Sequence, residues 1–291
     1  MELQQLRYFV AVAETGGFVR AAQRCGVTQP SLSQQIRKLE GELGRPLFDR
    51  SSRGAVPTEA GRALLPRAQR ILAEVRETIN GVQADVEMGR GPLSIGAIPT
   101  IAPYLLPPVL SRFLKQNPGC ELTVREDLTD RLIEAVVGHE LDAAIMSTPV
   151  DHPALNVEVV GRERLLVVAP ADSPLPERLG VEDLSDEPAV VLHEVHCLGR
   201  QIADFCSTAR LRRRIVCRST QLPTILSLVG LGMGISIVPE MAAKQDIGTT
   251  RLYRPLQGNP EREISVVRRS DRSVSSLCRS FLERLVEQLN S

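Results

Sequence analysis

The feature that most constrains how this chain folds is an amphipathic helix predicted to begin at Pro30. Leucine and isoleucine recur along it at steps of four, three and four residues, which is the spacing of one side of a helix. These apolar residues are Leu32, Ile36, Leu39 and Leu43. The opposite side is polar, so the helix is expected to pack one face on a core and to present the other to solvent or to a partner.

Two shorter helices are predicted to supply that core. The first has apolar residues at helical spacing from Leu3 to Ala13 and stops at Gly16-Gly17, and the second runs from Phe18 to Cys25. The segment GVTQ then makes a tight turn into the third helix. Helices joined in this way predict a small helix-turn-helix domain.

The polar face of the third helix is suited to DNA. Short hydrogen-bonding side chains near the start of a helix, with guanidinium and ammonium groups beside them, match the base edges and phosphates of a major groove. The residues predicted to contact DNA there are Thr28, Gln29, Pro30, Ser31, Ser33, Gln34 and Arg37. The alternative is a three-helix bundle whose polar face is only solvated.

A two-stranded wing is predicted after Gly44, where RPLFDRSSRGAVPT contains two short strands and a turn at residues 52–54. Arg50 and Arg53 lie on or beside this wing, where they would reach a minor groove or a phosphate. The whole chain has no net charge, but residues 1–70 carry eleven Lys and Arg against six Asp and Glu, so this head is at +5 and the remainder at −5. A basic head on an acidic body is expected when one module binds nucleic acid and the other does not.

A long helix is predicted from Thr58 to roughly Met88, followed by a hinge at Gly89, Gly91 and Pro92. Apolar residues recur along it every three or four positions, a pattern that predicts packing against a second copy. They are Leu64, Ala68, Ile71, Val75, Ile79, Val82 and Val86.

Beyond the hinge, short apolar strands alternate with helices in a βαβαβ order: LSIGAI, a helix over 103–116, ELTVRE, a helix over 130–138, and DAAIM. A second set of strands lies near residues 165, 189, 214 and 235, before EISVV and a final helix. Two lobes are therefore expected. The uncharged segment Ser219 to Pro239 contains Pro223 and three glycines, which predict a helix, a turn and a buried strand rather than a membrane span.

The remaining composition narrows the class of protein. The start MELQQLRYFV lacks the layout of a secretory signal, so a cytoplasmic protein is expected. The six cysteines have no paired CxxC spacing, so no metal and no cofactor is predicted. We also find no GxSxG, P-loop or HExxH motif, which argues against an enzyme.

Two cysteines, Cys197 and Cys206, lie nine residues apart in HCLGRQIADFC, near the two ends of one predicted helix. A cysteine at a helix amino terminus, beside His196, has its thiolate favoured, and the thiolate attacks peroxide. Nine helical steps separate the two Cα atoms by about 13 Å, whereas a disulfide needs roughly 4.4 to 6.8 Å, so the helix would have to unwind. Two cysteines that merely pack on a buried helix are the alternative.

The run AAQRCGVTQPSLSQQIRKLEGELGRPLFDR, followed by TEAG, closely resembles the helix-turn-helix signature of LysR-type regulators. The resemblance implies a winged helix-turn-helix domain over 1–58 and a linker helix over 59–90 that forms an antiparallel homodimer, with dimers pairing into a homotetramer on double-stranded operator DNA. It further implies a two-lobed α/β effector domain that folds like periplasmic binding proteins, with one lobe over 91–162 and 267–291 and the other over 163–266.

The segments IPTIAPYLLP, EDLTDRL, HCLGRQIADFC and GMGISIVPE resemble the peroxide-sensing branch of that family. The resemblance implies that Cys197 is the thiol that reacts with hydrogen peroxide and Cys206 the thiol that resolves it. It also implies an effector pocket of Thr100, Thr129, His196 and Arg269. Gly199 departs from the branch, which has an arginine there; in this chain Arg200 follows one position later.

Alternatives to this assignment remain open. Thr100 and Thr129 each stand at the start of a predicted helix, where threonine commonly acts as an ordinary cap. A LysR-type regulator gated by an anionic or polar metabolite in the cleft between its lobes would need no reactive cysteine. An enzyme or a solute-binding protein is a third class. Neither would need the basic helix-turn-helix head that this sequence predicts.

Overall fold

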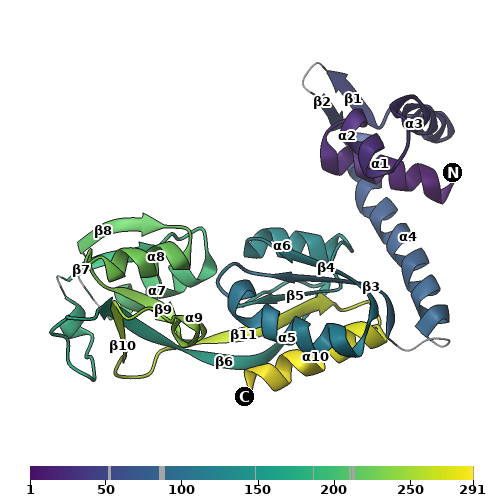
Figure 1. Ribbon diagram of the computed structural model, residues 1–291. Helices are drawn as coiled ribbons and strands as arrows, with labels where there is room; N and C mark the ends of the chain where they lie inside the picture. Colours follow the sequence, from purple (N-terminus) through teal and green to yellow (C-terminus); the bar gives the residue numbers. More distant parts are fainter. Residues whose placement is uncertain are drawn as a thin grey trace. The chain divides into compact units, whose positions relative to one another are not determined.

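The computed structural model describes residues 1–51, 54–84, 89–147, 149–185, 187–209, 211 and 214–290. Contacts within the chain divide it into two units (Figure 1). The first unit comprises Met1–Val86 together with Gly138–Glu140, and the second comprises Glu87–Val137 and Leu141–Ser291. Among the described residues, one hydrophobic core belongs to the first unit and two belong to the second.

Three helices enclose the core of the first unit, as the sequence predicts. They are α1 (Leu3–Thr15), α2 (Phe18–Arg24) and α3 (Gln29–Leu43). α1 ends at Gly16, whose φ of 66° lies in the left-handed region that glycine adopts without strain. Three apolar residues of α3 are fully buried: Leu32, Ile36 and Leu39. Leu43, the last residue of α3, is 41% exposed, so the buried face ends one turn earlier than predicted.

The predicted wing and long helix follow. β1 (Phe48–Ser51) pairs antiparallel with β2 (Gly54–Pro57), and α4 (Glu59–Ala84) begins shortly afterwards. α4 packs on α1, and Ala68 is buried there, whereas Ile79 is 48% exposed. The side chain of Val82 and all of Val86 lie outside the described residues. Dimerisation through α4 stays a prediction.

The second unit begins with the predicted βαβαβ order. Its elements are β3 (Arg90–Ala97), α5 (Ala102–Gln116), β4 (Gly119–Glu126), α6 (Thr129–Val137) and β5 (Ala143–Met146). β3 lies between β4 and β5 and pairs with both in parallel. The carboxyl ends of the three strands therefore meet at one edge of the sheet, which is where open α/β sheets bind ligands. Thr100, Thr129 and Ser147 all follow these strand ends.

One long strand, β6 (Leu155–Pro170), joins two lobes within this unit. Its first part pairs with β11 (Glu261–Arg269) and its last part with β9 and β10. We call the half with β3, β4, β5 and α10 (Ser276–Leu289) the first lobe, and the other half the second lobe (Figure 1). The second lobe contains η1 (Glu182–Leu184), β7 (Pro188–Leu192), α7 (Cys197–Thr208), β8 (Arg214–Ser219), α8 (Leu222–Gly230), β9 (Ser236–Pro239), α9 (Glu240–Gln245) and β10 (Arg251–Pro255).

The uncharged segment from Ser219 forms α8, a turn and the buried strand β9, as predicted. None of the helices in the described ranges has the length and apolar character needed to cross a bilayer. Sequence reasoning placed a strand only near residue 165 and none at β10, so it missed the first half of β6 and the strand that pairs with its end.

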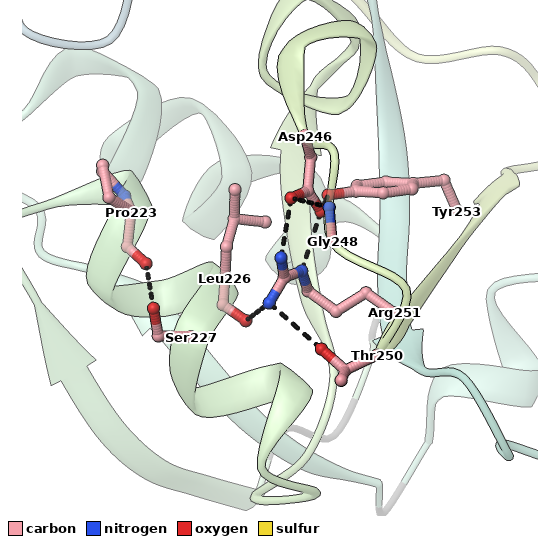
Figure 2. A network of polar contacts seen from close by, with 8 residues as sticks. All are labelled: Pro223, Leu226, Ser227, Asp246, Gly248, Thr250, Arg251 and Tyr253. Atoms are coloured by element: carbon pink, nitrogen blue, oxygen red, sulfur yellow. Dashed lines mark hydrogen bonds and ion pairs between the residues drawn. The ribbon is translucent and has the colours of Figure 1, made fainter.

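A polar network fixes the end of the second lobe (Figure 2). Arg251 donates two hydrogen bonds to the Asp246 carboxylate, at 2.7 and 2.6 Å, and a third to the carbonyl of Leu226 in α8 at 3.2 Å. The hydroxyl of Tyr253 also donates to Asp246. The bonds from Arg251 lower the pKa of Asp246 to about 2. The network therefore ties the loop before β10 to α8.

Asp246→Asn is expected to destabilise the second lobe at neutral pH and to have little effect in acid. The folded pKa lies below the value of about 3.9 for an unfolded aspartate, so the carboxylate contributes at most about 3 kcal/mol well above pH 4, and this contribution is lost as the pH falls through about 2. Urea unfolding at pH 7 and at about pH 1.5, below the folded pKa, measures the two cases. Glu134→Gln, in the exposed pair with Arg131, is the control and should change stability by less than about 1 kcal/mol.

Candidate nucleic-acid interface and redox site

The first candidate site is the solvent-exposed side of α3. Gln29, Pro30, Ser31, Gln34 and Arg37 are all exposed, and the positions from 30 to 37 recur at helical spacing along this side. The structure therefore brings most of the predicted DNA-contacting residues onto one open surface at the start of the helix.

Two of the residues predicted to contact DNA also form hydrogen bonds within the chain. Thr28 is the residue that caps α3, and its hydroxyl accepts from the backbone N–H of Ser31 at 3.4 Å. Ser33 was expected on the open face but is 6% exposed, and its hydroxyl accepts from the Gln29 amide at 2.9 Å. Successive residues of a helix point in directions about 100° apart. Ser33 follows the buried Leu32, so it lies at the edge of the buried face rather than at its centre.

The wing arginines are described less fully. Arg50 lies in β1 opposite Ala55, but its side chain is outside the described residues, as is the whole of Arg53. Their contact with DNA therefore stays a prediction.

Gln34→Ala is expected to relax sequence preference, because it removes a side chain that is predicted to read base edges and leaves the predicted phosphate contacts in place. Arg37→Ala should instead weaken binding to all sequences and flatten its salt dependence by about one charge. Titrations of specific and random duplexes at several salt concentrations separate these effects. Gln23→Ala, an exposed change on α2, is the control. Unchanged binding in both α3 variants would contradict this interface.

The second candidate site centres on Cys197, the first residue of α7. Cys197 is 3% exposed and packs in the core of the first lobe, although α7 belongs to the second lobe. Cys206, near the other end of α7, is 1% exposed and packs in the core of the second lobe. Neither cysteine forms a disulfide in this structure. The two sulfurs are thus held in different lobes by one intact helix, which must unwind before they can bond.

His196 precedes Cys197 and presents an unused acceptor. It is 7% exposed, and burial lowers its pKa, so the imidazole is neutral at pH 7. A neutral imidazole has one N–H donor and one acceptor nitrogen. The backbone of Thr220 hydrogen-bonds to the ring, while Nε2 is buried with no partner. A buried acceptor of this kind needs a donor, and a small hydroxylic ligand would supply one.

Thr100 is held by an arginine that sequence reasoning missed. Arg262 donates to the Thr100 hydroxyl and to its carbonyl, each at 3.0 Å, and to Glu163 at 2.8 Å. Arg262 is 3% exposed and Thr100 is 2% exposed. The residue that caps α5 is Ile101, so Thr100 does not have the ordinary capping role considered for it. Thr129 is the first residue of α6 and is also buried.

Arg269, the arginine chosen from the sequence, lies elsewhere. It donates to the carbonyl of Val137 at 2.7 Å and to Asp271 at 2.6 Å. Val137 ends α6 whereas Thr129 begins it, so Arg269 is at the far end of that helix, about 12 Å from Thr129. The structure corrects the expected pocket: Arg262, at the opposite end of β11, is the arginine beside Thr100.

Gln201 is a second residue that sequence reasoning missed. It lies one turn after Cys197 on the same side of α7, and its amide donates to the carbonyl of Ser147 in the first lobe. The Gln201 Oε1 and the Ser147 Oγ are both buried without a partner. The bond therefore joins the cysteine-bearing helix to the first lobe, and it leaves unused polar atoms beside it.

Gly199 explains how this chain differs from the branch it resembles. A Cβ at this position would lie 2.5 Å from the carbonyl oxygen of His193 and 2.9 Å from that of Leu192. The first turn of α7 is therefore packed directly on the end of β7, and no larger residue fits without moving the backbone. Arg200 is exposed and donates to the carbonyl of Glu194 at 3.1 Å, so it does not replace the missing arginine.

Within the described ranges, no group of three His, Cys, Asp or Glu side chains is arranged to hold a metal ion. The chemistry available at the second site is that of a buried thiol, a neutral imidazole, two hydroxyls and an arginine.

Two family models match the chain. The model of the bacterial regulatory helix-turn-helix protein of the lysR family matches residues 3–62, and that of the LysR substrate-binding domain matches residues 87–290.

Individual proteins are similar over nearly the whole length. A hydrogen peroxide-inducible genes activator from Dickeya chrysanthemi is 36% identical over 273 residues, covering 92% of this chain and 90% of the relative. The structure of a full-length OxyR variant from Pseudomonas aeruginosa superposes with a TM-score of 0.78 at 30% identity, covering 99% and 97% of the two chains. Full-length CbnR in complex with its target DNA superposes with a TM-score of 0.60 at 26% identity, covering 99% and 100%.

Proposed function

Because this chain belongs to the LysR family of bacterial transcriptional regulators, we propose that it is a DNA-binding regulator switched by hydrogen peroxide through oxidation of Cys197. Proteins of this family regulate transcription and are not enzymes, in line with the prediction from the sequence. The winged helix-turn-helix and the two-lobed α/β domain supply the parts such a regulator needs.

The observation that carries the peroxide proposal is the placement of Cys197. Its thiol packs in the core of the first lobe, the residue before it, His196, has a buried Nε2 with no partner, and a second thiol lies at the other end of the same helix. Similarity to peroxide-inducible activators points the same way. Thr100, held by Arg262, and Thr129 complete the proposed pocket, with Gln201 at its edge.

The proposed reaction has two steps. The Cys197 thiolate attacks one oxygen of hydrogen peroxide, so that an S–O bond forms as the O–O bond breaks, and the departing hydroxide takes a proton to become water. His196 Nε2 accepts a hydrogen bond from the peroxide, and Arg262 and Thr100 orient it. The Cys206 thiol then attacks the sulfenic sulfur, which forms a disulfide and releases a second water.

The second step would change the fold locally. Because Cys206 is held in the other lobe, disulfide formation requires α7 to unwind and the Gln201 bond to Ser147 to break. A covalent bond that selects a new conformation of one element is a recognised kind of switch. We propose that it changes how two recognition helices, joined through α4 in a homodimer or a homotetramer, meet the operator.

Thiol mapping tests the proposal. Reduced protein treated with hydrogen peroxide should contain a disulfide between Cys197 and Cys206 and should bind its operator differently. Cys278, whose pKa burial raises to about 12, should stay reduced and serves as the internal control. If both α7 thiols remain free and operator binding is unchanged, the peroxide proposal is wrong.

A metabolite-gated regulator is the second candidate, and one observation favours it. A cleft of about 620 Å³ lies between the lobes and is lined by Arg262, Ser147 and Gln201, which is the size of pocket that binds small organic molecules. A metabolite at a hundredfold excess over its Kd should stabilise the protein by about 2.7 kcal/mol. A response that persists in Cys197→Ser would favour this candidate over the first.

A further inference from the structure

The cleft between the lobes adjoins the proposed peroxide pocket. Its polar lining includes Ser147, Gln201 and Arg262, and Arg262 is hydrogen-bonded to Thr100 in the pocket. Cys197 is itself only 3% exposed, so an oxidant needs a route to the sulfur. The cleft is a hollow whose walls share Gln201 and Arg262 with that pocket, so it offers one such route.

α7 provides the connection between the sulfur and the cleft. Residues at i, i+4 and i+8 lie in one row along a helix, and in α7 these are Cys197, Gln201 and Phe205. Gln201 and Phe205 both line the cleft. Cys197 does not itself line the cleft, but it lies one turn from the polar amide of Gln201, which does.

The rest of the cleft wall has an apolar side, and Glu261 and Glu263 line the cleft elsewhere. Val157 and Val159 point to one face of β6, because they are two residues apart in a strand. Both line the cleft, together with Val150 and Leu165. Hydrogen peroxide contains two polar oxygens and no carbon, so contact with an apolar wall does not favour its binding. An organic group attached to a hydroperoxide would pack on it.

The size of the cleft supports the same conclusion. Hydrogen peroxide has about the volume of two water molecules, on the order of 60 Å³, whereas the cleft has a volume of about 620 Å³. The cleft therefore has room for an organic substituent beside the peroxide group. The polar end of the cleft is at Ser147 and Gln201, whose buried Oγ and Oε1 atoms have no partner.

We infer that this regulator also senses organic hydroperoxides, with the peroxide group at Cys197 and the apolar substituent in the cleft between the lobes. The inference rests on the proposed function. The thiolate attacks the outer oxygen of ROOH, the S–O bond forms as the O–O bond breaks, and the alkoxide leaves and is protonated to the alcohol ROH. The sulfur is oxidised and the hydroperoxide is reduced, after which Cys206 forms the disulfide and releases water.

Cumene hydroperoxide and hydrogen peroxide are the probes, used on the full reduced chain. The rate of loss of the Cys197 thiol is measured after rapid quenching, together with the yield of cumyl alcohol. We expect both oxidants to produce the same disulfide, with rate constants within about tenfold of each other and one alcohol formed per disulfide.

Val159→Phe tests the route. Val159 is 50% exposed, so a phenyl group there occupies the cleft without entering the core. It should slow cumene hydroperoxide at least about tenfold and leave hydrogen peroxide within about twofold, which is the scale of steric discrimination in an apolar pocket. Val216→Phe is the matched control, because Val216 is 44% exposed on β8 and does not line the cleft; it should change neither rate.

The outcomes separate the two proposals. If neither oxidant modifies Cys197, the peroxide proposal itself fails. If hydrogen peroxide reacts but cumene hydroperoxide is more than about a hundredfold slower, or if Val159→Phe slows neither oxidant, the inference about organic hydroperoxides is overturned and the peroxide proposal stands.

Discussion

Cys197→Ser is expected to abolish the response to peroxide while leaving operator binding by the reduced protein unchanged. Serine keeps the approximate size of the side chain, but its hydroxyl does not attack peroxide as a thiolate does. The rate of oxidation at this position should fall by about a thousandfold or more, equivalent to at least about 4 kcal/mol of activation free energy. Stopped-flow oxidation and an operator footprint with and without peroxide measure the two parts of this expectation.

Two other cysteine variants make the result specific. Cys206→Ser should stop the reaction at the sulfenic acid, which a dimedone adduct on Cys197 detects, because no second thiol lies on α7 to complete the disulfide. Cys217→Ser changes a half-buried thiol on β8 and should leave the response intact. A Cys197→Ser protein whose footprint still changes with peroxide would place the sensor outside α7.

The parts of this structure that depend on local pattern could be predicted from the sequence. Apolar spacing and glycine stops place α1, α2 and α3 because helix formation and capping depend on residues three to five positions apart. The elements from β3 to β5 follow for the same reason. The pair of cysteines in α7 is likewise visible as a spacing within a single helix.

The parts that depend on pairing between distant segments could not be predicted in the same way. Arg262 meets Glu163 across 99 positions, and only the antiparallel register of β6 and β11 brings the two together. In the sequence, Arg262 and Arg269 are both arginines in one strand, so nothing local distinguishes the pocket residue from the other. Gln201 is similar, since its partner Ser147 belongs to the other lobe.

Burial also depends on tertiary packing that a helical pattern describes only approximately. Ser33 is a polar residue, and the sequence pattern places it on the open face of the helix. It is buried in the structure, where the Gln29 amide donates a hydrogen bond to its hydroxyl and so offsets the cost of burial. Gly199 is a second example, since the sequence shows that an arginine is missing there but does not show why. The close approach of the backbone at His193 supplies the physical reason for a glycine there.

Glu163→Gln is expected to destabilise the second unit strongly, because it leaves the Arg262 charge buried without a counterion. The Glu163 and Arg262 side chains are 6% and 1% exposed, and removal of one partner from a buried pair costs about 3 to 5 kcal/mol. Glutamine still offers an acceptor to the backbone N–H of Met241, which Glu163 binds at 2.6 Å. The loss therefore reports on the ion pair rather than on that contact.

The double variant Glu163→Gln with Arg262→Met separates stability from function. It contains no buried charge at this position, so its loss of unfolding free energy in urea should be smaller than the sum of the two single losses by about 2 kcal/mol or more. Its oxidation by hydrogen peroxide should remain as slow as in Arg262→Met alone, because the guanidinium that holds Thr100 is absent. Strictly additive losses would mean that the two side chains stabilise the lobes independently, and recovery of the oxidation rate in the double variant would mean that Arg262 has no part in the pocket.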